Sequence, residues 1–284
     1  MTRITIVLFA ILPAALLDAP SVIAEDKPDD EGKHKTEPLY AYYGKVAAKY
    51  EFFRDAAKEQ PLKLIEKPVM KWATDDDWSG GVYVWKRNDL PAVIGCLLTG
   101  PTEPKGRRIA FQEFHLLSEE PIAPADMAGR FRWAPTAGLK RLRLEGAPEP
   151  ADTPALRLTQ MRQLLREFTA HMEANGVWEL RLLPQPLMRY QPKEGPVVDG
   201  ALFTFVWSKG TDPELILLME CHTTSNGMAW EYAPVRFSNR ELWLKHHDQE
   251  VWRGPVHREA GAESDQIYTT RYLDTIDDPR LEAR

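Results

Sequence analysis

Four histidines near the C-terminal end of the chain have the side-chain chemistry to bind a metal: His222, His246, His247 and His257. His246 and His247 precede Asp248, and imidazole and carboxylate groups are ordinary ligands of Zn²⁺. Adjacent side chains of a strand point to opposite faces of a sheet, so the two imidazoles could reach one ion only if the chain turned there. We therefore interpret the pair as a solvated strand end, and we predict no metal and no cofactor.

Nucleophilic and acidic motifs give no catalytic signature either. Cys221 precedes His222, but neighbours in a strand diverge, whereas thiol–imidazole catalysis needs the two groups in contact. The acidic run 75–77 lacks the spacing of a calcium loop, and Ser79 lacks the flanking pattern of a nucleophile elbow. The catalytic residues therefore stay unknown at this stage.

A catalytic site could still assemble from residues that are distant in the sequence. The polar groups that stand on predicted strands and could form a hydrolase-like site are Glu113, His115, Glu220, His222 and Glu231. Their convergence in a concave pocket would favour an enzyme, and an apolar cleft without them would favour a binding protein.

Tryptophan is frequent, with nine residues in the chain, and exposed tryptophans can bind sugars or proteins. Trp85 and Trp207 occupy equivalent positions in two similar stretches of the chain, which favours a place in the core for both. Trp78 and Trp252 stand near turns and charges, so we expect these two to lie at the surface and bind a ligand.

Two helices and a series of short strands are predicted to carry these residues. Apolar spacings of three and four indicate one helix over 39–57, ended by Pro61, and a second helix that starts at Thr153-Pro154 and ends at Asn175-Gly176. The predicted strands are 62–66, 69–73, 82–86, 92–99, 109–117, 139–144, 178–183, 187–190, 202–207, 215–222, 228–236 and 242–245.

The two halves of the chain have similar sequences. LKLIEKPVMKW at 62–72 aligns without a gap to LRLLPQPLMRY at 180–190, and each is followed by Val-Trp, five residues and a proline. This similarity predicts an α+β fold, a tandem duplicated unit of one helix followed by an antiparallel β-meander. The predicted units are 39–145 and 155–284, the second with a C-terminal extension, and 146–154 is a Pro-rich linker.

The central strands of both units have apolar side chains on both faces, as in Val82–Trp85 and Leu202–Trp207. A sheet exposed on one side would alternate apolar and polar residues. We therefore expect both faces to be covered, one by the helix and the other by the second unit, a partner subunit or an apolar ligand.

The two cysteines are predicted to remain unpaired. When the two halves are aligned, Cys221 lies three residues beyond the position of Cys96, and an odd offset places the two thiols on opposite strand faces. A disulfide needs converging side chains. We therefore expect two buried thiols, even in an oxidising compartment.

The N-terminus predicts export. Residues 1–24 combine a basic start, a short apolar run and a small-residue cleavage pattern, which indicates a signal peptide and a periplasmic or extracellular protein without a stable membrane span after cleavage. Residues 25–38 are charged and are expected to be disordered. The net charge of the 284-residue chain is −6, and no basic stripe indicates nucleic acid as a partner.

The segment LRLLPQPLMRY, with DGALFTFVW and GTDPELILLME after it, resembles a family of uncharacterised exported bacterial proteins. The resemblance is strongest over roughly 155–245. It implies export and carries no catalytic residue to this chain.

Two functions remain open from the sequence. The first is a non-catalytic binding or interaction module that uses its β-sheet face, with a protein, a glycan or an apolar ligand as partner, or a second copy in a homodimer. The alternative is the hydrolase-like enzyme with strand-borne Glu and His. An exported structural protein is a further alternative.

Overall fold

The computed structural model describes residues 30–128, 131–208, 210–259 and 261–282, with side chains from Thr36 onward. The structure is mostly β, with 49% strand and 12% helix. The predicted signal peptide and the first residues of the charged leader lie outside the described residues. No described helix is long and apolar enough to cross a membrane.

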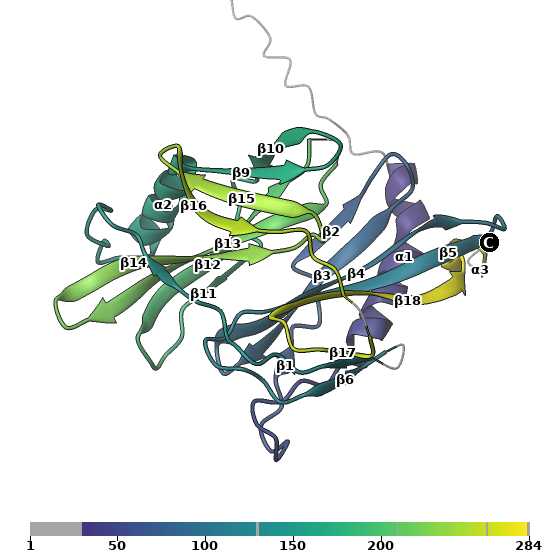
Figure 1. Cartoon of the computed structure of the whole chain (residues 1–284), viewed down its shortest axis with the longest axis horizontal. Helices are drawn as coiled ribbons and strands as arrows, with labels where there is room; N and C mark the ends of the chain where they lie inside the picture. Colours follow the sequence, from purple (N-terminus) through teal and green to yellow (C-terminus); the bar gives the residue numbers. More distant parts are fainter. Residues whose placement is uncertain (1–29, 129–130, 209, 260, 283–284) are drawn as a thin grey trace, which may run out of the picture.

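A six-stranded antiparallel sheet forms one half of the molecule. Its strands, in spatial order, are β1 (Lys63–Leu64), β3 (Ser79–Arg87), β4 (Leu90–Thr102), β5 (Arg107–Leu116) and β18 (Tyr268–Asp277), with β2 (Met70–Ala73) paired to β3. Helix α1 (Asp30–Ala47) covers one face, where Tyr43 packs with Trp85 in a common core. Figure 1 shows α1 in purple beside this sheet, with yellow β18 lying along β5.

A nine-stranded antiparallel sheet forms the other half and curls into a half-barrel. Its strands, in spatial order, are β16 (Gln249–Gly254), β15 (Glu241–His246), β9 (Phe168–Glu173), β10 (Val177–Leu182), β12 (Val197–Val206), β13 (Pro213–Thr224), β14 (Gly227–Arg236) and β8 (Leu142–Arg143), with β11 (Met188–Tyr190) paired to β12. Helix α2 (Pro154–Leu164) and the 3₁₀ turn η1 (Leu165–Glu167) bury Met161 and Leu165 against this sheet.

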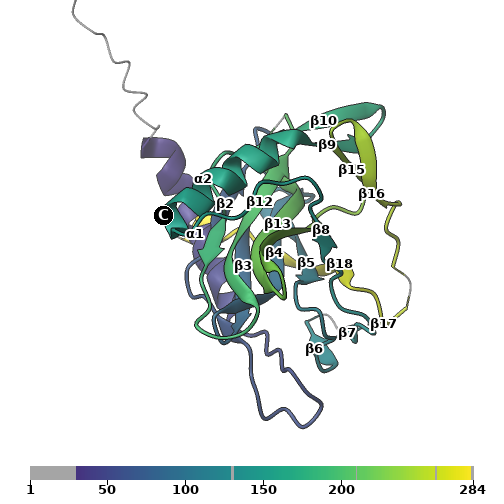
Figure 2. The ribbon, with the colours of Figure 1, turned by 90° about the vertical axis from the view of Figure 1, so that its left-hand side faces the viewer.

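A small third sheet and a short helix complete the described part of the chain. Strands β6 (Ala125–Met127), β7 (Phe131–Trp133) and β17 (Glu263–Ser264) form this sheet, in which β17 runs parallel to β7. It lies beneath the six-stranded sheet in Figure 2. Helix α3 (Pro279–Glu282) ends the described chain next to α1.

The two large sheets bury their remaining faces against each other. Successive residues alternate between the two sides, since Val84 joins the core between the sheets and Trp85 the core under α1. In the other sheet Leu202 faces the shared core and Phe203 faces α2. The expectation that both faces are covered is therefore confirmed, and the second sheet provides the cover.

The predicted fold class is wrong. The chain does not form tandem α+β units of a helix followed by a meander, because it is mostly β and one of its sheets is a curled half-barrel. Sheet membership also crosses the predicted linker at 146–154, since β8 precedes the linker but pairs with β14. Strand β18, from the C-terminal end, pairs with β5. Pairing partners this distant leave no local sequence signal.

Both predicted helices are shorter at their C-terminal ends than expected. Phe168 and Met172 fit the apolar spacing of a helix, but they lie in strand β9, where Phe168, Ala170 and Met172 alternate inward. Residues four apart are compatible with both periods, and the pairing of β9 with β10 and β15 decides between them. Helix α1 ends at Ala47, and it begins at Asp30, inside the leader that we expected to be disordered.

The predicted equivalence of Trp85 and Trp207 is not seen in the strand register. Trp85 pairs with Leu64, whereas the corresponding Leu182 pairs with Phe205. Trp207 follows the end of β12 and is only partly buried. The strand register thus places Phe205, two residues before Trp207, at the position that Trp85 has in the other half, and Trp207 lies beyond the strand.

Both cysteines are buried and unpaired, as predicted. Cys96 lies in the core between the sheets, and Cys221 lies in the core around α2. The thiols face different layers of the molecule, so they cannot meet.

Candidate functional site

A pocket of about 790 Å³ lies at the seam between the two large sheets. The six-stranded sheet contributes the β2–β3 turn and parts of β4, β5 and β18, and the other sheet contributes the β12–β13 and β14–β15 loops. The lining residues that matter most for its chemistry are Trp72, Asp75, Asp76, Trp78, Phe111, Glu113, Trp207, Asp212, Glu214, Phe237 and Arg240.

Trp78 is held in the wall of this seam pocket by the tight turn between β2 and β3. The Thr74 amide donates to the Trp78 carbonyl over 2.9 Å, and Asp77 adopts a positive φ of 66° that reverses the chain. Gly100 in β4 leaves room for the indole, because a Cβ there would lie 2.2 Å from a Trp78 ring atom. The ring centroid of Phe111 lies 6.1 Å from that of Trp78, so an aromatic surface faces the pocket.

Three carboxyl groups in the pocket share an unfavourable environment for negative charge. Burial and the nearby Glu214 carboxylate raise the pKa of Glu113 to about 8, although the Tyr268 hydroxyl donates a hydrogen bond to Glu113. Burial and the charges of Glu214 and Glu113 raise the pKa of Asp212 well above its usual range. Burial also raises the pKa of Glu214.

The counter-charge inside the pocket comes from Arg240. Its guanidinium lies 5.5 Å from the centroid of the Trp207 ring, a cation–π distance, and it lowers the pKa of both Asp212 and Glu214. Among the described lining residues it is the one basic side chain against five acidic ones. Because the pKa values of Asp212 and Glu214 stay raised, Arg240 does not fully offset the acids.

The arrangement is suited to hold a positive charge on an apolar body. Aromatic faces attract cations through their ring quadrupole, and a cation that enters the pocket would favour the ionised form of the carboxyls. Burial raises the pKa of all three carboxyls, so each of them has a weakened preference for the ionised form in the free protein.

Part of the predicted hydrolase set meets elsewhere, in a buried ionic network on the nine-stranded sheet. Glu220 accepts hydrogen bonds from Arg141 and Tyr190, both over 2.6 Å, and its Oε2 lies 2.9 Å from His222 Nε2. Burial would raise the pKa of Glu220, but the hydrogen bond with His222 and the ion pair with Arg141 hold it at about 2. Glu231 lies 3.6 Å from His222 at the edge of this network.

The geometry of the Glu220 network indicates a structural role. Glu220 is fully buried, and each of its oxygens already accepts a strong hydrogen bond. The other predicted residues do not join it, because Glu113 lines the seam pocket and His115 lines a different cavity. The five residues therefore do not form one site.

The cavity that His115 lines has a volume of about 410 Å³, and it is also lined by the second predicted ligand-binding tryptophan, Trp252. His115 lies in its wall, and burial lowers the pKa of the imidazole to about 4. Trp78 and Trp252 thus line two separate pockets. The seam pocket is the larger of the two and contains the acidic groups.

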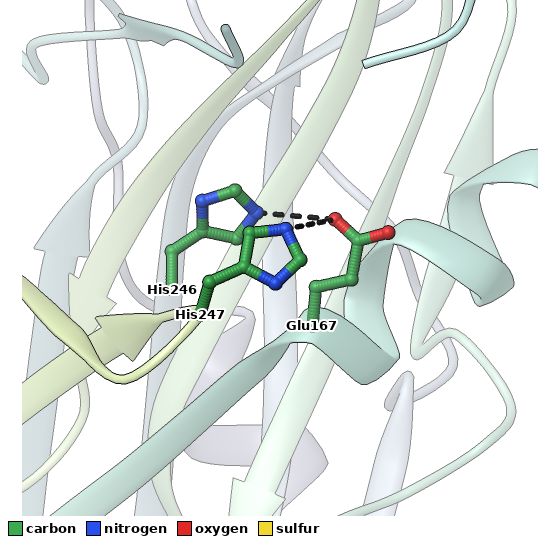
Figure 3. Close-up of side chains that lie close together, drawn as sticks. All are labelled: Glu167, His246 and His247. Atoms are coloured by element: carbon green, nitrogen blue, oxygen red, sulfur yellow. Dashed lines mark hydrogen bonds and ion pairs between the residues drawn. The ribbon is translucent and has the colours of Figure 1, made fainter. Parts of the chain in front are cut away.

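The two adjacent histidines do lie at a turn. His247 has a positive φ of 46° and Asp248 one of 65°, which places the pair in the tight hairpin between β15 and β16. Figure 3 shows both imidazoles directed to the carboxylate of Glu167.

Trp78 and Glu113 were predicted from the sequence as candidate site residues, whereas Asp212, Glu214 and Arg240 were not. The acidic pair flanks Pro213 in GTDPELILLME, directly before an apolar strand, so their burial could have been suspected from that position. The meeting of this loop with the β2–β3 turn could not, because it depends on the packing of the two sheets. No protein-family model, curated protein or solved structure matches this chain.

Proposed function

We propose that this chain is an exported, non-catalytic binding protein, and that the seam pocket captures a small organic cation with an apolar body. The single observation that carries the proposal is the group of three carboxyls, all with raised pKa, in the pocket that the indole of Trp78 also lines. A bound ammonium group would supply the positive charge that the carboxyls lack.

The size of the pocket fits a small molecule. Ligand pockets in proteins span roughly 300–1,000 Å³ and combine apolar walls with a few polar groups. The seam pocket, at about 790 Å³, lies within that range and has both kinds of lining. Export is proposed from the N-terminal segment of the sequence, and it would place the pocket in contact with solutes outside the cytoplasm.

The experiment that tests this function is calorimetric titration of the purified mature protein with matched probes. Hexylamine and choline carry a positive charge on an apolar body, 1-hexanol has the same chain as hexylamine without the charge, and a neutral glucose trisaccharide tests a glycan. We expect one equivalent of each cation to bind. Hexanol should bind at least about tenfold more weakly than hexylamine, which corresponds to a difference of about 1.4 kcal/mol in binding free energy.

Variants locate the binding. Trp78→Ala should weaken amine binding by roughly two- to thirtyfold, the range of a cation–π contact of about 0.5–2 kcal/mol, and Glu113→Gln should weaken it by about tenfold. Trp252→Ala is the matched control, because Trp252 lines the separate cavity. Equal affinity for hexylamine and hexanol, or preferential binding of the saccharide, would overturn the proposal.

A further inference from the structure

The contact between the β15–β16 hairpin and the 3₁₀ turn η1 brings together three side chains that can each ligate a metal. They are Glu167, His246 and His247, and one ligand atom from each lies within 4.8 Å of the others. Figure 3 shows the two imidazoles side by side, both facing the same carboxylate oxygen. The seam pocket uses none of these residues.

The spacing of the ligand atoms matches the coordination shell of a small transition ion. His246 Nε2 lies 3.1 Å and His247 Nε2 lies 3.3 Å from Glu167 Oε2. Zn²⁺ holds nitrogen and carboxylate oxygen at about 2.0–2.2 Å in tetrahedral geometry, and two ligand atoms of such a tetrahedron are about 3.3 Å apart. An ion could therefore enter between these atoms with little movement of the side chains.

The backbone fixes this arrangement independently of the side chains. The His247 amide donates to the Glu167 carbonyl over 3.1 Å, which ties the hairpin turn to η1. His246 pairs with Phe168 in the β9–β15 ladder, and the two rings lie 4.6 Å apart. Phe168 itself is buried in the core around α2, so the ligands start from a rigid base.

Exposure leaves the cluster accessible from solvent. The side chain of His246 is 16% exposed, that of Glu167 37% and that of His247 66%. A set of two histidines and one glutamate leaves one position of a tetrahedral ion open for water or another ligand. Imidazole and carboxylate ligands together suit Zn²⁺ and its neighbours among the first-row ions, rather than Mg²⁺ or Ca²⁺.

We propose that Glu167, His246 and His247 form a binding site for one divalent transition ion, Zn²⁺ in the first instance. The objection that adjacent strand residues point apart does not hold here, because the chain turns at His247. The site joins η1 to the β15–β16 hairpin and is independent of the cation proposed for the seam pocket.

The test is equilibrium titration of Zn²⁺ alone into metal-free protein that carries no polyhistidine tag. We expect one equivalent to bind, and the His247→Gln and Glu167→Gln variants each to bind at least about tenfold more weakly. His171→Gln is the matched control, because His171 lies on β9 outside the cluster, stacked on Trp243.

A spectroscopic measurement tests the same site without reference to affinity. Co²⁺ in place of Zn²⁺ should give the intense visible absorption of a four-coordinate ion in the wild type and in His171→Gln, and not in His247→Gln. Circular dichroism would verify that each variant is folded. Absence of stoichiometric Zn²⁺ binding, or binding that neither the His247 nor the Glu167 variant weakens, would overturn the proposal.

Discussion

At the scale of single residues, two buried glutamates have pKa values that are shifted in opposite directions. Glu220 is surrounded by donors and stays ionised, with a pKa of about 2, whereas Glu113 lies beside another acid and has a pKa of about 8. Burial disfavours the charge of both, and the partners determine the outcome. Glu220 therefore has a structural role, whereas the protonation state of Glu113 can respond to a bound ligand.

The pH dependence of stability should reveal Glu113. Its folded-state pKa of about 8 lies above the ordinary value of 4.5, so the protonated form favours folding. That stabilisation is complete below about pH 4.5 and is lost as the pH rises through 8, at about 1.4 kcal/mol per pH unit. In Glu113→Gln the side chain cannot ionise, so the free energy of unfolding should fall less between pH 5 and pH 8.

Urea denaturation of both proteins at the two pH values measures this difference. The other pocket acids are present in both proteins, and because the charge of Glu113 raises the pKa of Asp212, the difference between the two slopes reports Glu113 together with this coupling. Identical pH slopes for wild type and variant would contradict the assignment of a raised pKa to this residue.

Removing the charge of Glu220 should have a larger effect on the fold. In Glu220→Gln the guanidinium of Arg141, which is 10% exposed, loses its close counter-charge, and breaking a buried ion pair costs about 3–5 kcal/mol. Glu231→Gln is the control, because Glu231 is partly exposed and lies 3.6 Å from His222, so its loss should cost under about 1 kcal/mol. Chemical denaturation at pH 7 compares them, and equal losses would contradict the role given to Glu220.

At the scale of the elements, a glycine in strand β4 makes room for the Trp78 indole in the wall of the seam pocket. Gly100 lies under the Trp78 indole, and a Cβ there would be 2.2 Å from the ring. Gly100→Ala should displace Trp78 and destabilise the protein by about 1–3 kcal/mol, the usual cost of overpacking.

Gly44→Ala is the matched control for this substitution. Gly44 lies in α1, and a Cβ there would be 3.7 Å from the Tyr83 hydroxyl, an ordinary contact. Alanine in a helix interior favours folding by about 0.5–1 kcal/mol over glycine. Thermal unfolding should therefore shift in opposite directions for the two variants, and a neutral Gly100→Ala would contradict the packing described for Trp78.

The elements also show how far the sequence predicts this fold. Predicted strands with nearly continuous apolar runs, such as 82–86 and 215–222, lie within β3 and β13, because local pattern and tertiary pairing agree there. Phe168–Glu173 was taken for helix because its apolar spacing suits both periods, and its partners β10 and β15 come later in the chain. Strands β16 and β18 were missed, because their partly exposed residues carry little apolar pattern.

The residues of the candidate site were also only partly predictable from the sequence. Trp78 was identified because a tryptophan beside an acidic turn is conspicuous. Asp212 was not, because its importance depends on a second sheet whose position no local pattern encodes. The turn at His247 was not foreseen either, although it changes what the two histidines can do.

At the scale of the whole molecule, the two sheets separate the cysteines into different cores. Burial raises the pKa of the Cys221 thiol to about 11 and that of Cys96 well above its usual range. Both thiols should therefore react slowly in the native state, since the thiolate is the reactive form. After denaturation without reductant, a thiol reagent should label two groups per chain. Labelling that appears only after reduction would contradict the separation.

The proposed function depends on the seam between the two large sheets. Residues from both halves must meet there for Glu113, Asp212 and Glu214 to face one ligand. If a cation binds, carboxyls that are protonated in the free protein must ionise, so binding and proton release are linked. Affinity for the cation should rise with pH up to about 8, because fewer protons then have to leave.

The most direct test is titration calorimetry of hexylamine at pH 6.5, repeated in buffers with different ionisation enthalpies, which counts the protons released per ligand bound. Hexylamine itself stays fully protonated at this pH, so any protons come from the protein. We predict release of about one proton or more in the wild type and measurably fewer in Glu113→Gln. Amine binding without proton release, or no amine binding at all, would contradict the central claim that the seam pocket is a cation site.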